Sequence, residues 1–438
     1  MSDAGDGLLE GNAAQQVRSE DFRRWTFFAA IQIGTAICVP MFALGGDLGS
    51  HSRFLDLPIP VLIASTLVAL MSMATGYVGM TARLPTSVFT RTTFGVVGAK
   101  LLAAVLILTL LGWFGIQIEM LARAVVGLLD SQFGITVPLG AVIVASGLLV
   151  STTGIIGVKA LGKLATFTVP FLLAVITVPL WVAFGRIDVA GRLAAQPLLP
   201  AYDAGTIISI IAGGYMTGIA VTPDVSRFLA TRRDMVLGPL VALGLVLPFL
   251  ILLSASLAVI YGTGDLIGIM MRAGLAAPAL VILILATWSS NDKNLYESAL
   301  SLSALVPGVS RWMLASGAAA IGIAFAALGI FGHFIGFLIM LGIVIAPVAG
   351  LYTVDFALRP DRYAPDASAE TRAIRSLPFL VWALASAFGW STLPVAGGGL
   401  GLFTVTGVST LDALAAATGL YALATVALRS RMRKAPAV

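Results

Sequence analysis

The sequence predicts an all-α integral membrane protein with twelve transmembrane helices. Of its 438 residues, 58% are hydrophobic and only 11% are charged, whereas a soluble domain carries about 25% charged residues. A chain this long and this poor in charge does not have enough polar groups to cover a globular surface. Its outer solvent is therefore expected to be lipid, which excludes a soluble enzyme, a disordered chain and a nucleic-acid-binding domain.

The individual spans follow from windows of about 20 mainly apolar residues. Short polar or Gly/Pro-containing connections separate them, and no long linker divides the chain. A tail (1–23) precedes the twelve-helix domain (24–430), and a second tail (431–438) follows it. The predicted spans are 24–46, 58–82, 97–128, 137–153, 164–185, 205–223, 234–260, 275–304, 312–330, 332–356, 376–392 and 408–428.

Orientation follows from the Lys and Arg residues, which accumulate in cytoplasmic loops. Of the 26 such residues, Arg123 and Lys293 fall inside spans. The predicted outer loops contain only Arg53, Arg186, Arg192 and Arg272, and the others lie in the tails and the opposite loops. We therefore expect a multi-pass protein of the inner (plasma) membrane with both termini in the cytoplasm.

Two spans contain matching interruptions. The first has Gly34 and Pro40 in its middle, and the sixth runs through Gly213, Gly214 and Gly218 to Pro223. Gly and Pro are common in membrane helices, but interruptions at corresponding positions of two halves indicate an inverted repeat with a substrate between unwound half-helices.

The eighth span is unusually polar in its middle, with the run from Trp288 to Glu297. Its adjacent hydroxyls, Ser289 and Ser290, suit a dehydrated alkali cation whose other ligands are carbonyls of an unwound helix. The alternative, that each hydroxyl bonds to its own helix, remains open.

The third span places Trp113 and Gln117 on one helix face, where a flat ring and an amide suit a planar heterocycle. Packing is the other interpretation of this tryptophan. Glu119 and Arg123, also four residues apart, are expected to form a helix-packing ion pair. One cysteine (Cys38) and two histidines (His51 and His333) exclude a disulfide framework and a metal-ligand cluster, and no cofactor and no cleavable signal peptide are expected.

Four segments together resemble the nucleobase:cation symporter-1 family, and most closely its bacterial cytosine permease branch. They are Gly-Trp-Phe-Gly at 112–115, Thr-Pro-Asp-Val-Ser-Arg-Phe at 222–228, Trp-Ser-Ser-Asn-Asp-Lys-Asn-Leu-Tyr at 288–296 and Ala-Pro-Val-Ala-Gly at 346–350. The resemblance implies a leucine-transporter-type five-plus-five inverted repeat, here about 24–185 and 205–356, with extra helices at about 376–428.

The resemblance also implies a site. Sodium would bind the carbonyls of Gly34, Ile37 and Ala286 and the hydroxyls of Ser289 and Ser290. The substrate would lie between Trp113 and Tyr215, with polar contacts from Gln117 and from around Gly214, Thr217 and Ala286.

Three positions depart from the cytosine permease pattern. Leu110 and Ala286 replace amide side chains, and Gly214 replaces a serine. Losing three polar positions changes selectivity by several kcal/mol. We therefore expect a related pyrimidine, purine or other N-heterocycle rather than cytosine.

The expected function is secondary active symport of this solute with Na⁺, or with H⁺ if Lys163 or Lys293 supplies the charge, and no enzymatic chemistry. The expected partners are the solute and the lipid bilayer, with no nucleic acid and no obligate protein partner. The alternatives are an amino-acid or amine symporter of the same fold and, from another class, a channel or a non-transporting sensor.

Overall fold

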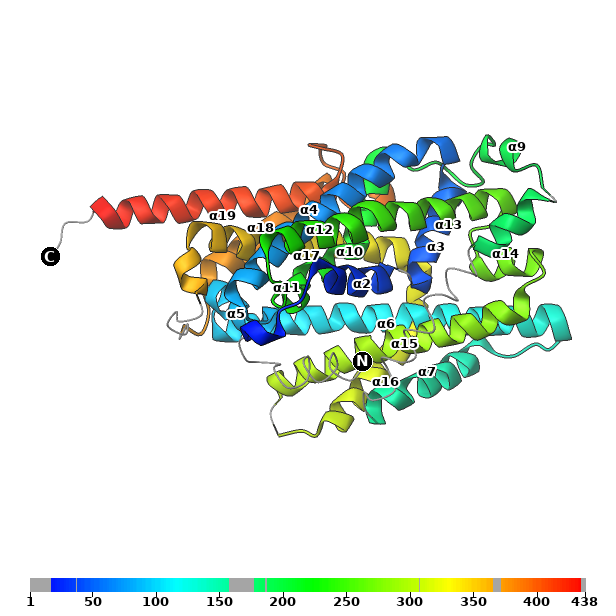
Figure 1. Cartoon of the computed structure of the whole chain (residues 1–438), viewed down its shortest axis with the longest axis horizontal. Helices are drawn as coiled ribbons and strands as arrows, with labels where there is room; N and C mark the ends of the chain where they lie inside the picture. The colour runs from blue at the N-terminus through cyan, green and yellow to red at the C-terminus, as the bar shows by residue number, and fades with distance from the viewer. Residues whose placement is uncertain are drawn as a thin grey trace.

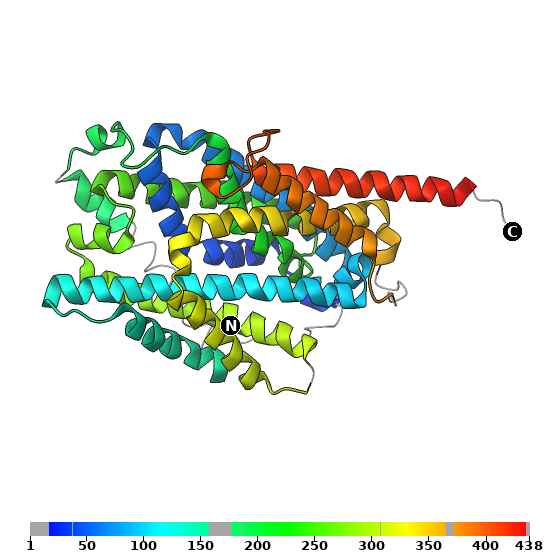
Figure 2. The same ribbon diagram turned by 180° about the vertical axis from the view of Figure 1, so that it is seen from behind.

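The protein is helical throughout the part that the computed structural model describes, which comprises residues 17–36, 38–156, 177–185, 187–306, 308–364 and 372–434. In these residues the one β-type pairing is an isolated bridge between Arg23 and Leu229. The helices form an elongated bundle in which α6 (Val96–Phe133) runs along the length of the molecule (Figure 1). Viewed from behind, α19 (Ser409–Lys434) extends past the other helices toward the C-terminus (Figure 2). The all-α prediction is confirmed for this part of the chain.

The other helices of the first half are α2 (Trp25–Ala36), α3 (Val39–His51), α4 (Pro58–Ala82), α5 (Thr86–Phe94), α7 (Leu139–Ile156) and α9 (Val189–Leu193). Those of the second half are α10 (Ala204–Ala220), α11 (Thr222–Ser226), α12 (Arg232–Pro239), α13 (Leu247–Tyr261), α14 (Leu266–Arg272), α15 (Ala276–Leu305), α16 (Arg311–Ala327), α17 (Phe334–Leu358) and α18 (Ser376–Thr392). A π-helical turn, Leu240–Val246, joins α12 to α13, and short 3₁₀ turns occur at Ser19–Asp21, Phe54–Asp56, Ile330–His333, Pro360–Tyr363 and Val395–Gly397.

Most predicted spans correspond to one helix of the structure. α4 and α18 have the predicted bounds, and α6, α7, α15, α16, α17 and α19 differ from prediction by a few residues at their ends. The predicted connections additionally contain the short helices α5, α9 and α14. The predicted fifth span, which includes Lys163, lies mostly outside the described residues, and its end, 177–184, is helical.

Several helices are suited to a membrane. By length and composition, five described stretches can cross one: Phe54–Ala82, Val96–Phe133, Arg232–Tyr261, Ile330–Leu358 and Ser409–Leu428. The bent pair α2–α3 makes a sixth, and Leu139–Thr152, α10 and α16 are apolar but shorter. These helices support a multi-pass membrane protein.

The interruption predicted in the first span is present. α2 ends at Ala36, α3 begins at Val39, and the two helix axes differ by 60°. Cys38 is extended, with φ −127° and ψ 156°, and Pro40 occupies the first turn of α3. Proline fits a first turn because its missing N–H has no helical partner there, so Pro40 begins a new helix rather than continuing the old one.

The interruption of the sixth span lies later than predicted. α10 continues through Gly213 and Gly214 and ends only at Ala220, and α11 begins at Thr222 with Pro223 in its first turn. The glycines serve close packing instead, because a Cβ on Gly213 would lie 2.0 Å from the carbonyl oxygen of Leu338 in α17. Small residues permit such close helix contacts in membranes. The predicted interruption is therefore present at the Pro223 end of that segment, whereas the helix does not unwind around Gly214 and Thr217.

The helices associate in two groups. α6, α7, α15 and α16 pack against one another, and α10 packs against α4 and α17, which in turn contacts α18 and α19. Figure 1 and Figure 2 show the first group along one side of the molecule. α3 packs mainly on α13, where Gly45 and Gly49 leave room for the backbone of that helix.

Near the end of α17, the buried carboxylate of Asp355 contacts arginine and tyrosine side chains from several segments. Asp355 is fully buried and lies 2.8 Å from the guanidinium of Arg359, 3.9 Å from that of Arg362 and 3.8 Å from that of Arg375. The hydroxyls of Tyr363 and Tyr421 donate to it at 2.7 and 2.8 Å. Burial, followed by the charge of Asp355, holds the pKa of Tyr363 well above its ordinary value. Tyr363 therefore stays protonated as a donor.

Candidate functional site

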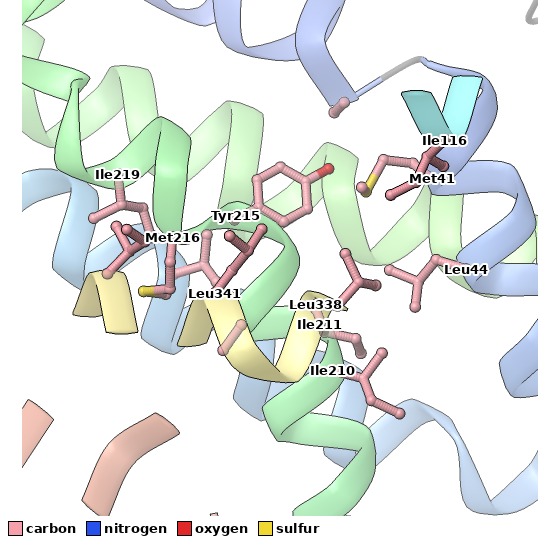
Figure 3. Close-up of a cluster of buried hydrophobic side chains, with 14 of the residues drawn as sticks. Met41, Leu44, Ile116, Ile210, Ile211, Tyr215, Met216, Ile219, Leu338 and Leu341 are labelled. Atoms are coloured by element: carbon pink, nitrogen blue, oxygen red, sulfur yellow. The ribbon is translucent and has the colours of Figure 1, made fainter. Parts of the chain in front are cut away.

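Four helices converge beside the break between α2 and α3. Figure 3 shows Met41 and Leu44 of α3, Ile116 of α6, Tyr215 of α10 and Leu338 of α17 in one cluster. A Cβ added to Gly214 would lie 3.8 Å from the Met41 terminal methyl and 3.6 Å from Leu338. The first span therefore meets the sixth and tenth at its point of interruption, as a shared site requires.

Tyr215 is the polar member of this cluster. Its side chain is buried, and its hydroxyl has no hydrogen-bond partner among the described residues. The hydroxyl points toward the side of the cluster occupied by Met41 and Ile116 (Figure 3), and it lies within electrostatic range of Cys38 at the break. A buried hydroxyl without a partner costs free energy, so this group is available to a ligand.

Gln117 provides a second unsatisfied group, on α6. The residue is 2% exposed, and its side-chain carbonyl oxygen accepts no hydrogen bond from the part of the chain that is described. It follows Ile116, which lies in the same cluster as Tyr215. Buried amide oxygens normally have donors, so both orphaned polar groups indicate a polar ligand near this junction.

Trp113 lies one turn before Gln117 and is partly buried. It packs edge-to-face against Phe334 at 6.1 Å and Phe337 at 5.5 Å, both on α17. These two rings hold the indole in a fixed orientation. The sequence analysis did not identify them as site residues, although their spacing of three places them on the same side of the span.

Thr217 already has an internal partner. Its hydroxyl donates to that of Thr109 at 3.5 Å, which joins α10 to α6 one turn before Trp113. The contact brings the two helices that carry Trp113 and Tyr215 together. Thr109 is a further residue that the sequence analysis missed.

The predicted ion ligands lie on two helices. Gly34 is in the last turn of α2, where carbonyls lack helical donors because the helix ends at Ala36. Ala286 is buried in the continuous helix α15, and Ser290, one turn later, is partly buried. Ile37 lies outside the described residues, as does the side chain of Ser289.

The break and α15 are close to each other. α3 contacts α15, and Cys38 lies within electrostatic range of Lys293. Lys293 pairs with Glu297 at 3.9 Å, so its ammonium has a partner on its own helix. The donor set of carbonyls and hydroxyls is of the oxygen type that hard cations prefer.

The predicted pair of Glu119 and Arg123 is confirmed, with two hydrogen bonds of 2.7 and 2.9 Å. Glu119 is fully buried, and its other oxygen accepts the backbone N–H of Phe331 at 2.8 Å. The carboxylate thus also fixes the turn that leads into α17, beside the rings that support Trp113.

Comparisons with known proteins agree on one family. Residues 18–373 match the family described as permease for cytosine/purines, uracil, thiamine, allantoin. The cytosine permease of Escherichia coli (strain K12) is 30% identical over 349 residues, which cover 79% of this chain and 80% of that protein.

Solved structures show the same fold. The inward-facing conformation of Mhp1 superimposes with a TM-score of 0.76 at 19% identity, covering 96% of both chains. Mhp1, a nucleobase-cation-symport-1 family transporter, in a closed conformation with bromovinylhydantoin bound, gives 0.75 at 20% identity with the same coverage. A Na⁺-coupled sialic acid symporter gives 0.61 at 10% identity, with 94% of this chain and 91% of that one covered.

Three findings lead to one conclusion: the family match, the identity to a cytosine permease over most of both chains, and the all-helical membrane fold. This chain belongs to the cytosine/purine permease family of nucleobase:cation symporters, and is a multi-pass membrane transporter rather than an enzyme.

Proposed function

We propose that the protein is a secondary active symporter that imports a nucleobase or related planar N-heterocycle with Na⁺ by alternating access. It would have twelve spans, with inverted repeats at about 24–185 and 205–356 and two further helices at about 376–428. The break between α2 and α3 and the likeness to Mhp1 over 96% of both chains support this organisation.

One observation carries the proposal for the substrate. Two buried polar groups lack partners in the described chain: the Tyr215 hydroxyl, which lies where α3, α6, α10 and α17 converge, and the Gln117 carbonyl of α6, in the residue after Ile116 of that cluster. A planar ring with donors and acceptors on its edge would satisfy both groups and stack on Trp113. Base–aromatic stacking contributes ~1–3 kcal/mol, so a few edge hydrogen bonds in addition give useful affinity.

The proposed substrate is not cytosine. Leu110, Gly214 and Ala286 offer no side-chain hydrogen bonds to a base edge, and the Gln117 oxygen and the Tyr215 hydroxyl are among the unpartnered polar atoms of the described residues. Unpaired polar edges are costly to bury. A ring with fewer exocyclic donors than cytosine fits this lining better.

For the ion, we propose that Na⁺ binds between the end of α2 and α15. Gly34 and Ile37 would contribute carbonyls, and Ser289 and Ser290 hydroxyls. The Ala286 carbonyl lies within a continuous helix, so it would offer its second lone pair. The pairing of Lys293 with Glu297 favours Na⁺ over a coupling lysine, while H⁺ is the alternative ion.

The proposed orientation places both termini in the cytoplasm of a cell whose inner membrane holds the protein, and it follows the positive-inside bias. One positive charge that crosses 100 mV contributes ~2.3 kcal/mol. At 1.36 kcal/mol per decade this supports roughly fiftyfold accumulation without any sodium gradient.

A thermal-shift screen of the purified protein tests the proposal. Nucleobases, hydantoins, allantoin and thiamine-related pyrimidines are each added with and without Na⁺. We expect a planar heterocycle to stabilise the protein more in Na⁺ than in choline, and uptake in proteoliposomes to follow the same rank order. Stabilisation by an amino acid instead would favour the amine-symporter alternative.

A further inference from the structure

The end of α3 away from the break carries two titratable side chains that the proposed cycle does not use. Asp47 and His51 are one helical turn apart, with side chains 28% and 17% exposed. They lie on the face of α3 opposite Gly45 and Gly49, which pack against α13. On the proposed orientation this end of the helix faces outside.

The same end of α3 is joined to the segment that enters α10. The backbone N–H groups of Leu198 and Leu199 donate to the carbonyl of Ser50, and that of Tyr202 donates to the carbonyl of His51, each at 3.0 Å. The rings of His51 and Tyr202 stack with centroids 4.2 Å apart and an angle of 13°. The outer half of the broken span and the start of the helix that carries Tyr215 therefore share one junction.

The geometry defines which imidazole nitrogen exchanges a proton. Nδ1 of His51 lies 2.8 Å from the carbonyl oxygen of Pro200, and a carbonyl only accepts, so Nδ1 carries the hydrogen. Nε2 faces the Asp47 carboxylate at 3.8 Å, beyond hydrogen-bond distance. Unprotonated, Nε2 presents a lone pair to a carboxylate. Protonated, it presents an N–H donor to the same oxygen.

The segments and helices around the pair carry further titratable groups. Tyr202 interacts with Asp47, and burial, followed by the charge of Asp47, raises the pKa of Tyr202, so its hydroxyl stays neutral. On α13 the titratable residue is Tyr261, which donates to the Pro179 carbonyl. The remaining titratable residues on neighbouring elements are Asp203 directly after Tyr202, Arg53 and Asp56 after α3, Asp188 and Arg192 at α9, Asp265 and Arg272 at α14, Lys100, Glu119, Arg123 and Asp130 on α6, and Asp292, Lys293, Tyr296 and Glu297 on α15.

We propose that Asp47 and His51 form a proton-binding site on the outer face, whose occupancy tightens substrate binding. A proton bound at Nε2 gives the imidazole a positive charge, which the Asp47 carboxylate 3.8 Å away on the same helix stabilises. The charge strengthens the hydrogen bond from Nδ1–H to the Pro200 carbonyl. That bond joins α3 to the segment before α10, and its strengthening would hold the break and Tyr215 in their binding arrangement. The site lies about eight residues beyond the start of α3, roughly 12 Å at 1.5 Å per residue, so it modulates the substrate site without being part of it.

This inference rests on the proposed function, and counterflow in proteoliposomes tests it. Radiolabelled uracil, hypoxanthine and cytosine are exchanged at equal pH on both sides, at pH 8.0 and pH 5.5, so that no proton gradient drives uptake. An ion pair this exposed contributes up to ~1 kcal/mol, which predicts roughly threefold to fivefold tighter half-saturation at pH 5.5. His51→Gln and Asp47→Asn should each exchange substrate with the same affinity at both pH values.

His333→Gln is the matched control, because it removes the other histidine of the chain and should keep the full response. A wild-type protein without a pH response, or a response retained by either Asp47→Asn or His51→Gln, would overturn the inference. Failure of the wild-type protein to exchange any of the three bases would instead count against the proposed substrate class. In that case ¹⁵N NMR of His51 at pH 8 decides the proton site, since an Nε2–H tautomer contradicts it and an Nδ1–H tautomer supports it.

Discussion

Removing the Tyr215 hydroxyl should raise the stability of the ligand-free protein and lower its affinity for the substrate. Without ligand the hydroxyl is buried with no hydrogen-bond partner in the described chain, which costs ~1–3 kcal/mol. Tyr215→Phe removes that cost, so the ligand-free protein should unfold with a free energy higher by ~1 kcal/mol or more. The same change removes a partner for the substrate, so affinity should fall by ~1–3 kcal/mol, or roughly 5- to 150-fold.

Tyr352 is the matched control for this substitution. It is also buried, but its hydroxyl donates to the Ala220 carbonyl at 3.1 Å. Tyr352→Phe should therefore lower the stability of the ligand-free protein by ~1 kcal/mol and leave substrate affinity unchanged.

Both variants are measured by denaturant unfolding of the ligand-free protein in detergent and by a binding isotherm in saturating Na⁺. The reasoning is refuted if Tyr215→Phe lowers stability as Tyr352→Phe does while affinity stays at the wild-type value. The Tyr215 hydroxyl would then have a partner of its own and no role in binding.

Four further substitutions test other parts of the account. Ser290→Ala should raise the half-saturating Na⁺ concentration about ten- to hundredfold, because an interaction with a charged group contributes ~1.5–3 kcal/mol. An unchanged dependence of uptake on Na⁺ concentration would remove Ser290 from the site. Gly213→Ala should sharply reduce the yield of folded protein, because its Cβ would lie 2.0 Å from the Leu338 carbonyl oxygen. Gly214→Ser should fold normally, because the nearest atom to its Cβ would be 3.6 Å away. The serine should also improve cytosine affinity about fivefold through one added hydrogen bond. Equal yields of the two glycine variants would contradict the packing argument. Asp355→Asn should lower the unfolding free energy by ~3 kcal/mol, because it leaves three arginines around a neutral group, and thermal unfolding at the wild-type temperature would exclude this effect.

Hydrophobic length located the spans well, because an apolar stretch has to match the thickness of lipid whatever it packs against. It did not reveal α5, α9 and α14, which are too short or too polar for such a window. The first break was also predictable, because Pro40 cannot continue the hydrogen bonding of the preceding turn.

The sixth span shows where sequence reasoning fails. Gly213 and Gly214 suggest an unwound segment, but glycine serves equally well for close helix packing. Only the position of Leu338, far away in the chain, decides between the two uses. The break falls instead at Val221, just before Pro223.

The sequence pointed to the polar and aromatic residues of the candidate site, but not to the side chains that pack against them. Trp113, Gln117 and Tyr215 are distinctive in a membrane helix. Phe334 and Phe337 are not, because phenylalanine is frequent in apolar spans, and their role depends on α17 lying against α6. The same holds for Asp355, whose partners come from separate parts of the chain.

The central claim is that an ion and a flat solute share a pocket at the break of the first span. Cys38 is the single cysteine of the protein and lies at that break, so its rate of alkylation by a small maleimide reports on the pocket directly. The account predicts that Na⁺ and the substrate found by the thermal screen together slow the labelling of Cys38 at least tenfold, and more than either does alone. Labelling at the ligand-free rate when both are bound at saturation would contradict it.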